Sequence, residues 1–331
     1  MDNRERTKIM VGFGLLMAAS LVPGLILALL SLPTLASVTT LSALGALIPA
    51  LMISTRAAWV TAAAMTAAAA VALPASTEPW LAAVVLGAAG AFVGVASRWA
   101  ASGFVVLAAI GVVFLIAEPP TLPSGVPPVT MLTAATAVSA MWGVGAGTLI
   151  RRRRRSTGLP APEAMPWSRA GAYAIILMLV LAVAGWWTVH LQLQHGGAWF
   201  LMTFLIILQP YLQDSLSRTV HRATGTVIGV IVAMVLYLLM GPWPVLLYVV
   251  GSIAAIAALT IRYTTKRPYW QYVTLLTPAV VLLEGMSSSV VDTAEERVGF
   301  TLLAAVIAVI IELLLRPGYR RAAVRVGADR Y

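Results

Sequence analysis

The sequence is poor in the residues that carry most enzymatic chemistry. It has no cysteine, so disulfides, thiol nucleophiles and cysteine-ligated metals are excluded. Its histidines are His190, His195 and His221, and we expect the first two in an outer loop without an acidic residue at metal-ligand spacing. The sequence contains neither a G-x-S-x-G motif nor a Walker-type glycine loop. We therefore expect neither an enzyme nor an ATPase, and no cofactor or metal.

Charge is scarce as well. Only 10% of the 331 residues are charged and 60% are hydrophobic, whereas soluble domains carry about 25% charged residues. The apolar residues form blocks of about 15 to 24, close to the roughly 20 residues that cross a bilayer as a helix. We therefore predict an all-α polytopic membrane protein with about twelve spans. The expected spans cover residues 9–32, 38–53, 57–73, 80–96, 103–117, 129–150, 170–189, 198–212, 223–240, 245–261, 269–283 and 298–315.

The basic residues follow the positive-inside rule. With the N-terminus in the cytoplasm, all 22 lysines and arginines except Arg297 fall on the cytoplasmic side. The excess of basic charge behind the net +10 is then expected to face the cytoplasm and the anionic lipid there, while the outer side is net acidic. The arginine run at 151–155 lacks interleaved aromatic residues and directly follows a span, so we expect no nucleic-acid binding. We expect a multi-pass protein of the bacterial inner membrane with both termini in the cytoplasm, and a retained first span rather than a signal peptide.

A basic linker divides the chain into two expected halves. The linker, RRRRRSTGLPAPEAMPWSR, covers residues 151–169 and separates a first half at 1–150 from a second at 170–317, with a tail at 318–331. Each half has an even number of spans, so an internal repeat would be parallel. LIPALMISTRAAW in the first half resembles LQPYLQDSLSRTVHRATG in the second, and Glu118 and Glu284 each end the fifth span of their half. We expect the halves to have arisen by duplication.

The second of these segments carries an unusual stripe of polar residues. Asp214, Arg218 and Arg222 recur at i, i+4 and i+8, and Gly225 and Gly229 continue the same helical face. We expect the charged part on the cytoplasmic turn between the eighth and ninth spans. In the first interpretation the arginines anchor a helix end at the lipid headgroups, and the glycines allow another helix to pack closely.

In the second interpretation the same stripe binds an anion. The N-terminus of the ninth span, Arg218, Arg222 and protonated His221 would attract the anion from the cytoplasm, and the glycines would let it approach the backbone. Arg297 is either neutralised by the preceding DTAEE segment or is an anion ligand near the outer mouth. Candidate proton carriers are Asp214, Glu284 and Glu312. Apolar surroundings would favour the protonated form of Glu312, which alternatively pairs with Arg316, and Glu284 is either a coupling site or a solvated helix cap.

The second half resembles a known family. WFLMTFLIILQPYLQDSLSRTVHRATGTVIGVIVA at 199–233 is similar to the segment of the fusaric acid resistance (FUSC) family, within the aromatic acid exporter superfamily, in which a W...Q-P helix precedes R-x-x-G-T-x-x-G. Residues 267–285 and 292–317 resemble the spans that follow. Arg222, Gly225, Thr226 and Gly229 match the motif, and Arg297 matches the arginine that opens the last helix. Many relatives add large cytoplasmic domains, for which this sequence has no counterpart.

The resemblance implies export of organic anions, typically aromatic carboxylic acids, driven by the proton gradient. Because distant plant relatives are dimeric anion channels, a passive homodimeric channel is the first alternative. A membrane scaffold for an envelope complex, without transport, is the second. On the exporter hypothesis the substrate pathway comprises Arg218, His221, Arg222, Gly225, Thr226, Gly229 and Arg297.

Overall fold

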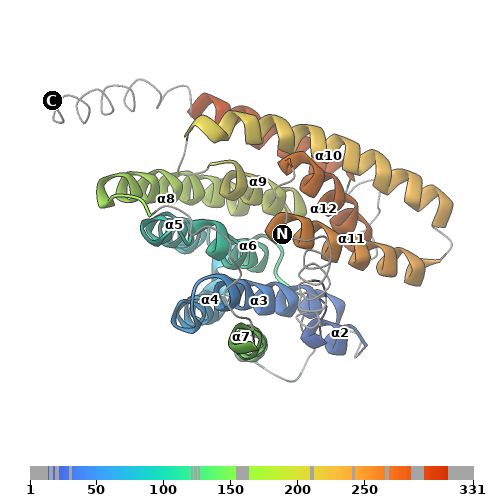
Figure 1. Cartoon of the computed structure of the whole chain (residues 1–331), viewed down its shortest axis with the longest axis horizontal. Helices are drawn as coiled ribbons and strands as arrows, with labels where there is room; N and C mark the ends of the chain where they lie inside the picture. Colours follow the sequence, from blue (N-terminus) through green and yellow to red (C-terminus); the bar gives the residue numbers. More distant parts are fainter. Residues whose placement is uncertain are drawn as a thin grey trace.

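The described part of the chain is helical. In the computed structural model, residues 14, 18, 22–29, 32–120, 122, 125, 127–153, 164–208, 212–240, 243–264, 268–284 and 294–311 are described, and these ranges contain no strand. The named helices are α2 (Val22–Leu29), α3 (Pro33–Met52), α4 (Thr55–Thr77), α5 (Pro79–Ala96), η1 (Ser97–Trp99), α6 (Ser102–Ala117), α7 (Pro128–Arg153), α8 (Trp167–His190), α9 (Gln194–Ile207), α10 (Leu212–Met240), α11 (Pro244–Thr264) and α12 (Tyr269–Glu284). Residues 294–311 form a last helix (Figure 1).

Five helical segments are long and apolar enough to cross a membrane by length and composition. They are Thr55–Thr77, Pro79–Trp99, Pro128–Arg152, Trp167–His190 and Thr219–Met240. Every expected span is overlapped by a helix of the described part, and the shorter apolar helices lie among the longer ones. The all-helical, multi-pass architecture is thus confirmed, while the number of twelve spans and the cytoplasmic termini stay predictions.

Two boundaries differ from the sequence prediction. Helix α7 continues to Arg153, because arginine is a good helix former and nothing interrupts the first part of the run. Helices α7 and α8 thus overlap both ends of the linker predicted at 151–169, whose residues 154–163 lie outside the described part. His190 ends α8 and His195 lies in the first turn of α9, so the expected outer loop shrinks to a turn at 191–193. Gln192 closes that turn in the left-handed region, at φ 52°.

The two halves meet at a tight contact between α5 and α8. Gly90 and Gly94 of α5 lie against the backbone of Leu177 and Ala174 of α8, where any side chain would collide. Small residues let two helix backbones approach this closely, which is the usual way that helices associate in lipid. The α5–α8 contact therefore joins the first half to the second through backbone packing.

Tryptophan pairs mark both ends of this contact. Trp80 and Trp186 lie at one end with ring centroids 5.9 Å apart, and Trp99 and Trp167 lie at the other, 5.6 Å apart. From Trp80 to Trp99 the chain rises about 28 Å at 1.5 Å per helical residue. This separation matches the roughly 30 Å thickness of the hydrocarbon core, whose two interfaces are enriched in tryptophan. The aromatic pairs thus support a membrane-spanning α5–α8 unit independently of hydropathy.

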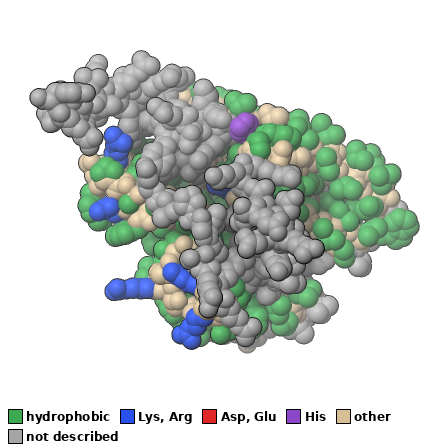
Figure 2. Space-filling model, viewed as in Figure 1, with side chains coloured by type: hydrophobic (Ala, Val, Ile, Leu, Met, Phe, Trp, Pro, Cys, Tyr) green, Lys and Arg blue, Asp and Glu red, His purple; other side chains and the backbone are tan. Residues whose placement is uncertain are grey.

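Basic side chains gather at one end of the molecule. Figure 2 shows most of the visible Lys and Arg side chains at the left of the described surface, with apolar side chains covering much of the remainder. Arg56 near the start of α4, Arg152 near the end of α7 and Arg169 near the start of α8 are all exposed. Their common end is the one that the positive-inside rule assigns to the cytoplasm.

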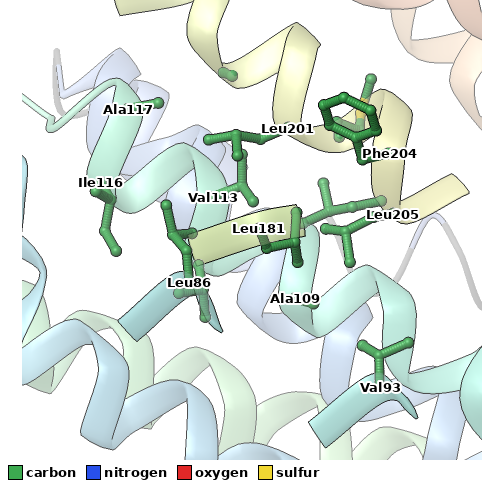
Figure 3. Close-up of a cluster of buried hydrophobic side chains, with 14 of the residues drawn as sticks. Leu86, Val93, Ala109, Val113, Ile116, Ala117, Leu181, Leu201, Phe204 and Leu205 are labelled. Carbon is green, nitrogen blue, oxygen red and sulfur yellow. The ribbon is translucent and has the colours of Figure 1, made fainter. Parts of the chain in front are cut away.

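Helix α9 lies at the centre of the bundle. No residue from 196 to 208 is exposed, and α9 packs against α6, α8 and α10. Figure 3 shows Leu201, Phe204 and Leu205 of α9 within the largest apolar cluster, together with side chains from α5, α6 and α8. With 14 residues, α9 is about 21 Å long and too short to cross the hydrocarbon core. A short helix buried by longer ones is typical of a transporter's binding region.

Candidate functional site

Arg222 lies inside a helix rather than on a cytoplasmic turn. Helix α10 begins at Leu212, so Arg222 falls in its third turn, and its side chain is only 1% exposed. The expectation that the charges occupy a turn is therefore wrong. The reason is that the segment after Leu212 contains neither proline nor glycine before Gly225, and its polar side chains are compatible with a helix.

The buried guanidinium of Arg222 reaches α9. Its Nη2 donates a hydrogen bond of 3.4 Å to Oγ1 of Thr203, which in turn donates to the carbonyl oxygen of Trp199 at 2.7 Å. Nε and Nη1 of Arg222 have no hydrogen-bond partner among the described residues. Burying a charge costs several kcal/mol unless an opposite charge and further hydrogen bonds compensate it. The position therefore favours an anion beside Arg222.

Arg297 reaches the same short helix from the last helix. It lies in the first turn of the last helix, is 1% exposed, and holds its guanidinium carbon 4.0 Å from the centroid of the Trp199 ring. This is well within the roughly 6 Å range of a cation–π contact. Phe114 of α6 meets the same ring edge-on at 5.4 Å. Glu295 and Glu296 are exposed and do not share the buried position of Arg297, while Asp292 lies outside the described part.

The two arginines converge on adjacent turns of α9. Trp199 and Thr203 are four residues apart, which places them on one face of α9 with about 6 Å of rise between them. From the sequence, Arg222 was expected near the inner mouth of a path and Arg297 near the outer mouth. The structure instead joins them through one buried segment. Trp199 and Thr203 were missed as site residues, although their spacing in WFLMT would have signalled a shared helical face.

The glycines of the motif lie at a packed helix–helix contact. A Cβ atom at Gly225 would lie 2.7 Å from Cβ of Val273, and one at Gly229 would lie 2.6 Å from Cβ of Thr277. Both partners belong to α12. The packing interpretation of the stripe therefore holds for Gly225 and Gly229. Arg222, three residues earlier, points toward α9 instead.

The remaining predicted residues are less closely involved in this cluster. Thr226 of α10 is 2% exposed, and His221 is partly exposed. Asp214 and Arg218 lie in the first turns of α10 and Glu284 ends α12, but the placement of their side chains falls outside the described part, as does the whole of Glu312. Within the described residues, no group of three or more His, Asp or Glu side chains could hold a metal ion.

Comparison with known proteins shows a family resemblance over residues 179–311. The family model described as fusaric acid resistance protein-like matches residues 179–311. This range runs from within α8 to the end of the last described helix, and it includes α9 and both buried arginines. No curated protein and no solved structure matches the chain. The resemblance seen in the sequence motifs is thereby confirmed: residues 179–311 of this multi-pass membrane protein are similar to the fusaric acid resistance protein-like family.

Proposed function

We propose that this protein exports organic anions, aromatic carboxylates foremost, across the bacterial inner membrane in exchange for protons. The family match supports membrane transport in general. The observation that carries the proposal further is Arg222, a guanidinium that is 1% exposed and has two nitrogen atoms without partners among the described residues. Ionisable residues buried in a membrane bundle usually mark the pathway of an ion or substrate.

The cluster on α9 fits both parts of an aromatic carboxylate. A carboxylate beside Arg222 would accept charge-assisted hydrogen bonds from Nε or Nη1, which are stronger than bonds between neutral groups. The substrate ring would meet the aromatic side chains about one turn away, where Trp199 and Phe114 are in contact. Arg297 would add positive potential at the same site. Such a site binds an amphipathic anion better than a small inorganic one.

The pathway in this proposal runs along α9 rather than along the glycine face of α10. Gly225 and Gly229 hold α10 against α12 and thereby fix the helix that carries Arg222. Arg218 and His221, at the cytoplasmic end of α10, would raise the local concentration of anions near the entrance. Asp214, Glu284 and Glu312 remain the candidates for carrying the exchanged proton.

The direct test is anion flux in proteoliposomes. The purified protein would be assayed with a panel of aromatic and aliphatic carboxylates, with and without an imposed pH gradient. We expect uptake that the pH gradient accelerates, a preference for aromatic acids, and loss of uptake in Arg222→Ala. Arg222→Lys keeps the charge but loses the planar set of donors, so we expect partial activity.

A matched control and two contrary results make the test decisive. Arg56 is an exposed arginine of α4, and Arg56→Ala should transport at the wild-type rate. Anion current that reverses at the Nernst potential of the anion, without response to pH, would replace the exporter by a passive channel. Absence of any flux together with stoichiometric co-purification of a partner would point to a scaffold.

A further inference from the structure

Helix α12 contains four buried polar side-chain atoms without a hydrogen-bond partner among the described residues, whereas α7 and α8 contain one such threonine hydroxyl each, at Thr136 and Thr188. Many serine and threonine hydroxyls donate to a carbonyl one turn earlier in their own helix, as Thr61 does to Ala57 at 2.9 Å and Thr260 to Ile256 at 2.7 Å. The Oγ1 atoms of Thr274 and Thr277 are buried and have no hydrogen-bond partner among the described residues. Within the same helix this also holds for Oε1 of Gln271 and the hydroxyl of Tyr269.

A proline adds a further acceptor to this row. Pro278 lies inside α12, and because proline has no N–H, the carbonyl of Thr274 loses its bond from the residue four positions on. That carbonyl oxygen lies 3.0 Å from the position of a Cβ at Gly229, beside the side chain of Thr277. Thr277 is 0% exposed. Thr277 and the carbonyl of Thr274 therefore lie at the contact between α10 and α12, and the buried polar side-chain atoms of α12 do not face lipid.

The spacing of this row suits single water molecules. Gln271, Thr274 and Thr277 follow one another at i+3, which places successive Cβ atoms about 5 to 6 Å apart. Two hydrogen bonds of about 2.8 Å span a similar distance, so the spacing has room for one water between neighbouring side chains. Buried polar groups that lack a protein partner are normally satisfied in this way. A hydroxyl both donates and accepts hydrogen bonds, so Thr274 and Thr277 would keep such a chain continuous.

We propose that Gln271, Thr274 and Thr277 line a file of bound water that conducts protons along the α10–α12 contact. The inference rests on the proposed proton-coupled export and names the proton route for it. At each step an oxygen accepts a proton from one neighbour and passes a different proton to the next, so that one O–H bond forms and one breaks. The net change along the row is a proton accepted at the Gln271 end and released at the Thr277 end.

The proton route is separate from the anion site. The anion cluster involves α9, α6, the last helix and the side of α10 that bears Arg222. The polar row lies on α12, where it meets Gly229. Tyr269 begins α12, and by the predicted topology it marks the cytoplasmic end of the route. Glu284 ends the helix seven residues beyond Thr277. Arg222 and Gly229 are seven residues apart on α10, so the anion site and the polar row meet this helix about 10 Å apart along its axis.

The test removes two hydroxyls without changing shape. Thr274→Val with Thr277→Val keeps the side-chain volume, and Thr61→Val is the control because its hydroxyl is already bonded within its own helix. Proton influx would be followed with a pH-sensitive dye while benzoate is transported from proteoliposomes. We expect gradient-driven transport to fall at least about tenfold in the double variant, since proton transfer between positioned groups contributes that much or more. Benzoate counterflow at equal pH should stay at the wild-type rate.

Stability separates this role from a structural one. A hydroxyl that holds the fold together lowers the melting temperature when it is lost, whereas here we expect the double variant to melt no lower than the wild type. Thr277→Ser keeps the hydroxyl and should retain coupling. Equal gradient-driven transport in wild type and double variant would overturn the inference, as would coupling to a sodium gradient in place of protons. Absence of counterflow in the wild type would instead overturn the proposed function itself.

Discussion

Replacing Arg222 by methionine should separate stability from transport. The guanidinium is 1% exposed and its one hydrogen bond to a described residue is long, at 3.4 Å to Thr203. Methionine fills a similar space with apolar atoms and adapts to irregular gaps. Substitution of a buried charge by a well-packed apolar side chain is typically neutral or stabilising by about 1 to 4 kcal/mol. We therefore expect the free energy of unfolding of Arg222→Met to stay equal or rise.

Transport by Arg222→Met should decrease, although its stability stays equal or rises. Loss of one partner from a buried, hydrogen-bonded charge pair costs about 2 to 5 kcal/mol. At about 1.4 kcal/mol per factor of ten, this corresponds to a reduction of roughly 30- to 4000-fold in apparent affinity for a carboxylate. The assay measures thermal unfolding in detergent and concentration-dependent benzoate uptake on the same preparation.

The control and the refuting result are both accessible. Arg56→Met alters an exposed arginine and should change neither quantity. The reasoning fails if Arg222→Met lowers the free energy of unfolding by more than about 2 kcal/mol, which would identify a structural ion pair. It also fails if uptake is unchanged, because the anion would then bind elsewhere.

Three further outcomes are expected. Gly229→Ala should destabilise the fold by about 1 to 3 kcal/mol, because the added Cβ would clash with α12. The control Gly103→Ala, whose Cβ would meet nothing within 4 Å, should be neutral or stabilising, and thermal melting compares the two variants. Trp199→Leu removes a cation–π contact of about 0.5 to 2 kcal/mol and should raise KM for aromatic acids more than for aliphatic ones, in the flux assay. Because the natural chain has no cysteine, Trp80→Cys and Trp99→Cys can be labelled singly, and an impermeant maleimide should reach the first only from outside and the second only from inside. Labelling of both from one side would contradict the membrane position of α5.

The two halves show where sequence similarity overestimates structural similarity. The segments around Pro49 and Pro210 resemble each other, and each leads to a helix with an early arginine. Helix α4 begins at Thr55, so Arg56 lies in its first turn and is exposed. Helix α10 begins ten residues before Arg222, which carries that arginine into the bundle. The start of the helix, rather than the motif, therefore decides whether the charge meets water or the protein interior.

The two arginines of the site were predictable from the sequence, but their contacts were not. Arg222 and Arg297 are conspicuous in an apolar sequence because a charge inside a span is costly. That both arginines contact α9 could not be predicted, because it depends on how α9, α10 and the last helix cross. The role of Gly225 and Gly229 was equally undecided, because a glycine face suits both a packed helix and a path until the neighbouring helix is placed.

The sequence by itself determined the helical membrane class, the helices and the sidedness expected from charge, because hydropathy and charge act locally along the chain. It also contained the motifs by which residues 179–311 match a family. Tertiary structure alone decided that Trp199 and Thr203 join Arg222 and Arg297 in one cluster. It likewise decided that the glycine face is closed by α12. These features depend on contacts between residues distant in sequence, for which periodicity provides no information.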